Sequence, residues 1–266
     1  ADEALMLLRR QRRDIIDAPL PDLADNAVQQ SPQDWTKSLD YFIDQKICEK
    51  VGVTKLREEW VYAHHSTAFN NVILLGVAHD YEELSAAPTL QAGIEVTHQY
   101  CRAAAAAKQV AGWLRQKGWD AEPVTGPMVG KILMIPHALE AGFGELGKHG
   151  SLINPEFGSA FRLGAVLTDA PFELTSKVTY GIDDFCMNCR VCEDACPPEA
   201  IMPDKKLIRG ETRWSVDFDK CLPFFAETSG CAICIAVCPW SRPGVGMNLA
   251  EKLARRAGRL ATSSSK

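Results

Sequence analysis

The chain has 266 residues, of which 46% are hydrophobic and 24% charged, ordinary values for one globular domain with or without a small second one. No apolar run approaches the ~18 residues of a membrane span, so we expect no integral membrane segment. The net charge of −5 argues against a nucleic-acid partner bound through a broad basic face. The unusual feature is ten cysteines, eight of them between positions 186 and 238.

The first half of the chain predicts a mixed domain. Residues 1–34 are polar and interrupted by prolines, which favours an arm or linker with one short helix before compact structure begins near residue 35. The apolar run 71–79 is too short for a good helix and predicts a strand buried on both faces. Residues 95–118 predict a long helix, because apolar residues recur at three- and four-residue steps along a narrow, alanine-lined face.

The second half changes character after Tyr180. Residues 161–168 predict another strand, and residues 181–245 combine short turns, prolines and cysteines, as expected of a module held together by a cofactor. We therefore divide the chain into an arm (1–34), a domain (35–180), a cysteine-rich module (181–245) and a tail (246–266). The tail predicts a short basic helix, for which a solvated face is a simpler interpretation than a binding role.

The chain begins Ala-Asp-Glu without the apolar core of a signal peptide. Its first residue is not Met, which leaves open a tag remnant or a mature end after removal of a leader. The sequence as given favours the cytoplasm, with export as the alternative.

The cysteines form two related runs. Cys186, Cys189, Cys192 and Cys196, followed by proline, match the C-x2-C-x2-C-x3-C-P pattern of bacterial two-cluster ferredoxins. The second run has Cys221 ahead of a C-x2-C-x3-C-P segment. A disulfide framework fits poorly, because a chain of this size has enough core without it.

Three thiolates on one tight loop can reach three corners of an iron–sulfur cube, while the fourth points to the other cube. We therefore assign two [4Fe–4S] clusters, with these ligands: Cys186, Cys189, Cys192 and Cys238 for cluster 1, and Cys196, Cys221, Cys231 and Cys234 for cluster 2. Structural zinc is the alternative. Zinc does not explain three evenly spaced cysteines and a fourth before proline, present twice.

A glycine motif between the two predicted strands, Gly142-x-Gly144-x-x-Gly147, matches the G-x-G-x-x-G of dinucleotide-binding folds. That fingerprint needs a strand before it and a helix after it, and the flanking prolines and Gly150 oppose both. The glycines instead favour close approach of the backbone to another large flat ligand, or a plain loop.

Several segments together resemble the corrinoid-dependent reductive dehalogenases. They are 135–150 (IPHALEAGFGELGKHG), 153–158 (INPEFG), 162–164 (RLG), 168–169 (TD) and the two cysteine runs that end in Cys-Pro-Trp. The resemblance covers about residues 70 to 243. The chain resembles epoxyqueuosine reductase more distantly. That enzyme usually has Gly-Trp where this chain has Gly144-Glu145, and it has an upstream catalytic Asp that is not found here.

The resemblance implies an α+β fold, in which a nitroreductase-like α/β cobalamin-binding domain is joined to a two-[4Fe–4S] ferredoxin-like module. It implies an oxidoreductase that replaces the halide of a small organohalide by hydrogen, with electrons from an external donor such as a ferredoxin or a flavodoxin-type reductase. The usual Asp-x-His-x-x-Gly segment is absent from the sequence, so we expect cobalamin to be base-off, with no protein ligand to cobalt. A low coordination number suits reduced cobalt.

Family members pair a proton-donating tyrosine with a cationic side chain, and the matching positions here are Tyr100 and Arg162. A phenol needs a neighbouring cation to act as an acid near neutral pH. Tyr100 could equally be a core residue, and Arg162 an ion-pair partner of Asp169 or Glu156.

Candidate cobalamin contacts follow the glycine motif. They are Gly142, Gly144, Gly147, Lys148 and His149, the last two as contacts to the corrin amides or the nucleotide phosphate.

Two other functions stay open. One is an epoxyqueuosine-reductase-like enzyme acting on tRNA, which the acidic net charge opposes. The other is an electron-transfer protein whose first domain has no cofactor and only docks a partner. A ferredoxin needs no domain of ~180 residues ahead of its clusters, which weighs against this second alternative.

Overall fold

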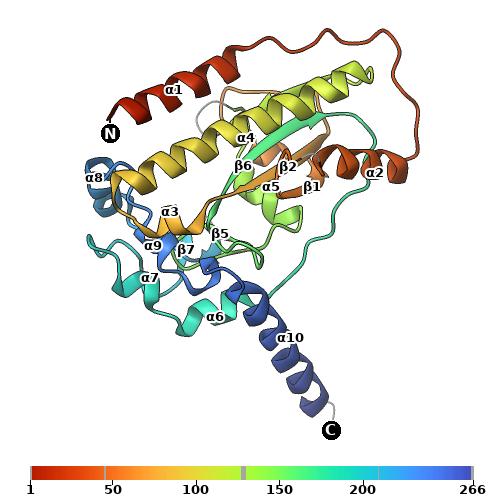
Figure 1. The fold of residues 1–266 in the computed structure, drawn as a ribbon. Coiled ribbons are helices and arrows are strands. Elements are labelled where there is room, and N and C mark those ends of the chain that lie inside the picture. The colour runs from red at the N-terminus through yellow and green to blue at the C-terminus, as the bar shows by residue number, and fades with distance from the viewer. Residues whose placement is uncertain (1, 45, 127–129, 209, 265–266) are drawn as a thin grey trace. The chain divides into compact units, whose positions relative to one another are not determined.

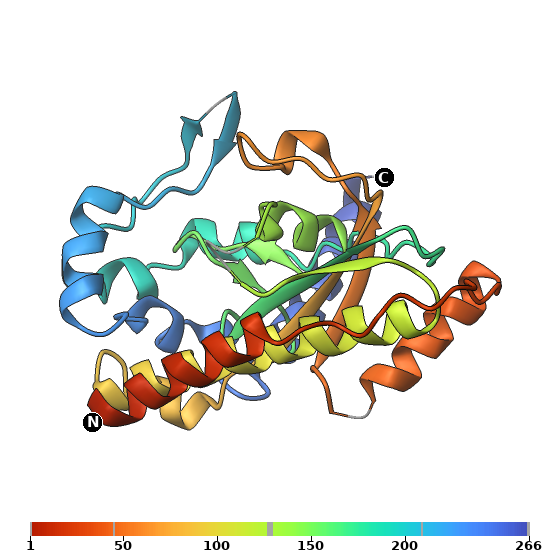
Figure 2. The same cartoon turned by 90° about the horizontal axis from the view of Figure 1, so that it is seen from above.

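The computed structural model describes residues 2–44, 46–126, 130–208 and 210–264 (Figures 1 and 2). The chain forms two compact units, each built from separate segments. The first unit comprises 1–78, 96–143 and 161–177, and the second comprises 79–95, 144–160 and 178–266. The four-part division at residues 34, 180 and 245 stays a prediction. No helix among the described residues is long and apolar enough to span a bilayer.

A four-stranded antiparallel sheet forms the centre of the first unit. Its order is β1 (Lys50–Lys55), β2 (Asn71–Ala78), β6 (Phe161–Thr168) and β3 (Ala121–Val124). The central pair β2 and β6 is in register from Asn71 opposite Thr168 to Ala78 opposite Phe161. Seven of the eight residues of β2 are buried, which confirms the strand predicted at 71–79. The strand predicted at 161–168 is confirmed as β6.

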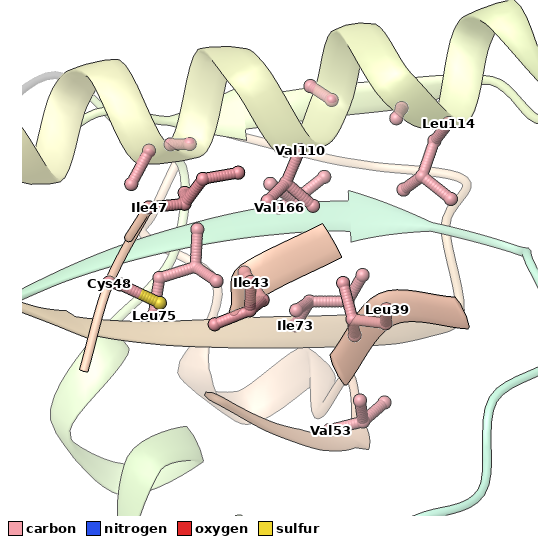
Figure 3. Close-up of a cluster of buried hydrophobic side chains, with 14 of the residues drawn as sticks. Leu39, Ile43, Ile47, Cys48, Val53, Ile73, Leu75, Val110, Leu114 and Val166 are labelled. Atoms are coloured by element: carbon pink, nitrogen blue, oxygen red, sulfur yellow. The ribbon is translucent and has the colours of Figure 1, made fainter. Parts of the chain in front are cut away.

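Helix α4 (Leu90–Gln116) covers one face of this sheet together with α2 (Pro32–Ile43). Figure 3 shows Val110 and Leu114 of α4 facing the side chains of the strands and of α2. The alanine-lined face allows β6 to approach closely, since a Cβ at Gly164 would lie 2.7 Å from the carbonyl oxygen of Ala103. The long helix predicted at 95–118 is confirmed and begins earlier, at Leu90.

The predicted arm contains helix α1 (Asp2–Asp17), which lies alongside α4 in both views (Figures 1 and 2). The thiol of Cys101 donates to the carbonyl of Leu8 at 3.3 Å, and the ammonium of Lys108 donates to that of Ile16 at 3.1 Å. Helix α2 follows, with the Ser31 hydroxyl accepting from the backbone N–H of Asp34 as its N-cap. A helix is present in this segment as predicted, but α1 has 16 residues and packs within the first unit.

The other face of the sheet packs against α5 (Met134–Glu140) and Phe143. A Cβ at Gly76 would lie 2.9 Å from the Phe143 ring, so glycine is needed for this close contact. Helices on the two faces of an antiparallel sheet make an α+β arrangement, as predicted.

The second unit contains mostly short elements and one long helix, α10, around a small core. They are α3 (Tyr81–Ser85), β4 (Glu145–Leu146), β5 (Leu152–Ile153), α6 (Ile182–Asn188), α7 (Val191–Asp194), β7 (Lys206–Ile208), β8 (Glu211–Arg213), α8 (Phe218–Glu227), α9 (Ile233–Ala236), the 3-10 helix η2 (Pro239–Ser241) and α10 (Val245–Ser264). Trp214 and Trp240 are the largest side chains of the core. Helix α10 packs Leu253 against this core, so the helix predicted in the tail is confirmed. The last two residues of the tail lie outside the described residues.

The glycine motif lies in neither of the contexts that a dinucleotide fingerprint requires. Helix α5 precedes it, the two-residue strand β4 lies within it, and β5, the antiparallel partner of β4, follows it. The rejection of a dinucleotide-binding fold is therefore confirmed.

Candidate functional site

Four cysteines of the second unit line one pocket, and we call them the first thiol group. They are Cys186, Cys189, Cys192 and Cys238. The first three lie on α6, its C-cap and α7, and Cys238 is the residue before η2, more than 40 positions along the chain. The structure thus brings together the four residues predicted as ligands of cluster 1.

The carboxylate of Glu145 binds the backbone at the start of α6, the helix that carries Cys186. It accepts hydrogen bonds from the backbone N–H groups of Tyr180 and Ile182, at 2.8 and 3.0 Å. One donor of the first turn of α6, the N–H of Ile182, is therefore satisfied by a charged side chain, which stabilises the helix that carries the first cysteine.

The second thiol group comprises Cys196, Cys221, Cys231 and Cys234. The thiols of Cys196, Cys221 and Cys231 all contribute to the electrostatic environment of Cys234, so the four lie near one another. The backbone at Cys231 and Ala232 has positive φ values of 46° and 66°. Two consecutive non-glycine residues in this region are strained, and such strain is concentrated at functional sites.

The environment of these thiols suits binding to iron. Burial, together with the neighbouring thiols, raises the pKa of Cys192 and of Cys234 to about 12. Burial also raises the pKa of Cys186 and of Cys238 to about 11. Without a bound metal these buried thiols keep their protons. Iron supplies the positive charge that stabilises several thiolates in one place, so the residues present fit an iron–sulfur cluster.

The two thiol groups are also neighbours. Cys234 of the second group contributes to the electrostatic environment of Cys192 in the first. All ten cysteines of the chain are free thiols in the structure. No three His, Cys, Asp or Glu side chains among the described residues are arranged to hold a single metal ion; in a cube, each thiolate binds a different iron.

Lys148 and His149 line the same pocket as the first thiol group. The Lys148 side chain is only 3% exposed, and its ammonium lies 3.3 Å from the Glu193 carboxylate. His149 is buried, and its Nδ1 accepts from the backbone N–H of Ser151. Both side chains therefore have protein partners inside the second unit.

The glycines of the motif are explained by the packing of the chain itself. Gly144 has φ of 144°, and a Cβ there would lie 1.8 Å from the carbonyl oxygen of Ile153. A Cβ at Gly147 would lie 2.5 Å from the Ile153 side chain, and one at Gly142 would lie 2.6 Å from the carbonyl oxygen of Ser176. As described, these residues with Lys148 and His149 do not form an open cradle for a corrin. Their role as cobalamin contacts stays a prediction.

Tyr100 and Arg162 are brought together in the first unit. The guanidinium carbon of Arg162 lies 4.9 Å from the centre of the Tyr100 ring. Its Nε is buried and has no hydrogen-bond partner among the described residues. Asp169, one of the alternative ion-pair partners, instead accepts from the backbone and side chain of Asn70, both at 2.8 Å. Tyr100 is half-buried.

The sequence interpretation missed Arg12, whose guanidinium also lies over the Tyr100 ring. Its guanidinium carbon is 5.4 Å from the Tyr100 ring centre, and its Nη2 donates to the carbonyl of Thr125 at 3.5 Å. A signal was present, because Leu5, Leu8 and Arg12 recur at helical spacing and Leu5 is buried. The guanidinium groups of Arg12 and Arg162 thus both lie close to the Tyr100 ring.

The comparisons with known proteins agree with this picture. The model of the 4Fe-4S dicluster domain family matches residues 185–241. The tetrachloroethene reductive dehalogenase of Dehalobacter restrictus is 33% identical over 208 residues, which are 73% of this chain and 37% of the relative. The epoxyqueuosine reductase of a Synechococcus species is 31% identical over 144 residues, which are 51% of this chain and 43% of the relative.

A solved reductive dehalogenase, whose structure suggests a mechanism for B12-dependent dehalogenation, superposes with a TM-score of 0.80 at 23% identity. The match covers 93% of this chain and 39% of that chain. The chain thus spans well under half the length of the dehalogenases it matches, and it contains a 4Fe-4S dicluster domain within an α+β fold. The resemblance predicted from the motifs is confirmed: the chain is a relative of the reductive dehalogenases and, more distantly, of the epoxyqueuosine reductases.

Proposed function

We propose that the chain carries the electron-transfer and proton-donating residues of a cobalamin-dependent reductive dehalogenase. The observation that carries this proposal is the 33% identity over 208 residues to a tetrachloroethene reductive dehalogenase. In the reaction a carbon–halogen bond breaks and a carbon–hydrogen bond forms. The carbon centre takes up two electrons and one proton, and the halogen leaves as halide.

The eight clustered thiols hold two [4Fe–4S] clusters, one in each thiol group. Support comes from the pocket shared by the first group and from the mutual electrostatic effects within the second. The proximity of Cys192 to Cys234 is the arrangement that electron transfer between two clusters needs. An external donor, a ferredoxin or a flavodoxin-type reductase, supplies the electrons.

Cobalamin, when bound, supplies a cobalt centre that exchanges electrons with the organohalide. We propose that it is base-off, without a protein ligand to cobalt. Its support is the relative whose structure suggests a mechanism for B12-dependent dehalogenation, and the absence of an Asp-x-His-x-x-Gly segment from the sequence.

Tyr100 holds the proton that replaces the halide. Arg162 lies against the ring, and its positive charge stabilises the phenolate that remains after proton transfer. Arg12 adds a second positive charge on the same ring. Positioned acids of this kind typically accelerate a reaction by ~10²–10⁴-fold.

Halide release by anaerobically reconstituted protein tests the proposal. The protein is supplied with cobalamin, reduced viologen and a panel of chloroethenes and bromophenols, and a parallel reaction contains a tRNA stem loop with epoxyqueuosine. We expect halide and the hydrogen-substituted product in equal amounts. Conversion of the tRNA without halide release would favour the epoxyqueuosine-reductase alternative. Protein that takes up iron but no cobalt and carries out neither reaction would favour a simple electron-transfer protein.

A further inference from the structure

The pocket of the first thiol group contains a buried cation, the ammonium of Lys148. The side chain is 3% exposed, and Lys148 lines the pocket together with all four thiols of that group. The backbone N–H of Lys148 also donates to the sulfur of Cys186. Lys148 thus approaches the same set of thiols through both its main chain and its side chain.

Two groups accompany this ammonium. The Glu193 carboxylate lies 3.3 Å away and is 14% exposed, and the Trp214 ring centre lies 5.1 Å away. Glu193 also contacts the exposed Arg190 at 3.1 Å. A buried charge costs several kcal/mol when it is taken out of water, unless opposite charges and hydrogen bonds compensate for it. Glu193 compensates the charge of Lys148 only in part, because its carboxylate also contacts Arg190. Further negative charge in the pocket would therefore stabilise the Lys148 ammonium.

An iron–sulfur cluster held by four thiolates supplies that charge. Its net charge is negative and becomes more negative by one unit on reduction, so a fixed cation nearby favours the reduced form. Net charge, hydrogen bonds to sulfur and solvent exposure set the potential of such clusters. The buried position of Lys148 reduces screening by water and salt.

We propose that Lys148 is a positioning residue that raises the reduction potential of the cluster in the first thiol group, with Glu193 opposing it. This inference rests on the proposed cluster ligation and concerns electron transfer, not the halogenated substrate. It gives Lys148 a role other than a contact to the corrin. It also predicts effects of opposite sign for the two members of one ion pair, which loss of packing alone does not produce.

Redox titration of the reconstituted protein, followed by electron paramagnetic resonance, tests the inference. Lys148→Met removes the charge and keeps the backbone N–H. We expect reduction of this cluster to become roughly tenfold less favourable, which is ~59 mV for a one-electron couple. Glu193→Gln should shift the same potential upward, and Lys148→Arg should stay near the wild-type value. Lys206→Met is the matched control, because Lys206 is an exposed lysine of the same unit.

Unchanged potentials in both Lys148→Met and Glu193→Gln would overturn the inference, as would shifts of the same sign. If Lys148→Met loses iron, the potential of Glu193→Gln alone tests the inference. An upward shift would support it, and an unchanged or lower potential would overturn it. A wild-type protein without two clusters would overturn the proposed function itself. Two intact clusters whose potentials ignore these charges would overturn only the role of Lys148.

Discussion

Replacement of Arg162 by Gln tests how the tyrosine acts. The guanidinium carbon lies 4.9 Å from the centre of the Tyr100 ring. A unit charge about 5 Å from a developing phenolate is worth about 3 kcal/mol at an effective dielectric constant of ~20. Both side chains are partly exposed, which lowers this value. At 1.36 kcal/mol per tenfold change in rate, we expect turnover to fall roughly 10- to 100-fold.

The assay is steady-state halide release with reduced viologen as donor, and iron and cobalt contents are measured beside it. Tyr100→Phe should keep the fold and the cofactors and lose ~10²-fold or more in turnover. If Arg162 acts through the phenol, Arg162→Gln should cost little more in the Tyr100→Phe background. Additive losses would refute this coupling. Nearly wild-type turnover of Tyr100→Phe would instead show that Tyr100 is a packing residue.

Four further outcomes are expected. Cys196→Ala should remove the cluster of the second thiol group and lower iron from about eight to about four per chain; loss of both clusters would contradict the crossed ligation. The Co(II) form of bound cobalamin should show no nitrogen superhyperfine splitting in its electron paramagnetic resonance spectrum, and such splitting would refute base-off binding. Gly158→Ala should destabilise the fold by roughly 2–5 kcal/mol in urea unfolding, because φ is 60° and its Cβ would lie 2.4 Å from the backbone nitrogen of Ser241. At Gly210 φ is also positive, but a Cβ would meet open space, so Gly210→Ala should lower the free energy of unfolding by only roughly 1–2 kcal/mol. Equal losses of stability in Gly158→Ala and Gly210→Ala would contradict this reasoning. Burial lowers the pKa of His137 below its ordinary value of 6.5. Below pH 6.5 the unfolded chain therefore binds more protons at this residue than the folded chain does. The stability contributed by neutral His137 should be complete above pH 6.5 and fall as the pH drops toward the folded pKa, whereas His137→Gln should flatten this part of the stability curve.

Hydrophobic pattern and cysteine spacing made much of the fold predictable. The strand at 161–168 has the predicted bounds, because a continuous apolar run between turn residues allows few alternatives. The beginning of α4 was placed five residues late, although Thr89, a residue type favoured at helix N-caps, stands directly before Leu90. The cysteine runs indicated two groups because the spacing itself reflects the shape of a cube.

The parts of the site that depend on tertiary packing were harder to predict. The helical spacing of Leu5, Leu8 and Arg12 indicates which arginine faces inward, but the contact of Arg12 with Tyr100 depends on how α1 packs along α4, which no local pattern indicates. The partnership of Lys148 with Glu193 joins residues 45 positions apart, which no local pattern indicates. The glycine motif suggested a ligand, whereas contacts with Ile153 account for two of its glycines.

The metal content of anaerobically reconstituted protein tests the proposed cofactors most directly. Iron, acid-labile sulfide, cobalt and zinc are measured per chain, alongside the electron paramagnetic resonance spectrum of the reduced protein. We expect about eight irons and eight sulfides, one cobalt, and the spectrum of two interacting [4Fe–4S] clusters. Stoichiometric zinc, or iron for a single cluster, would contradict this expectation.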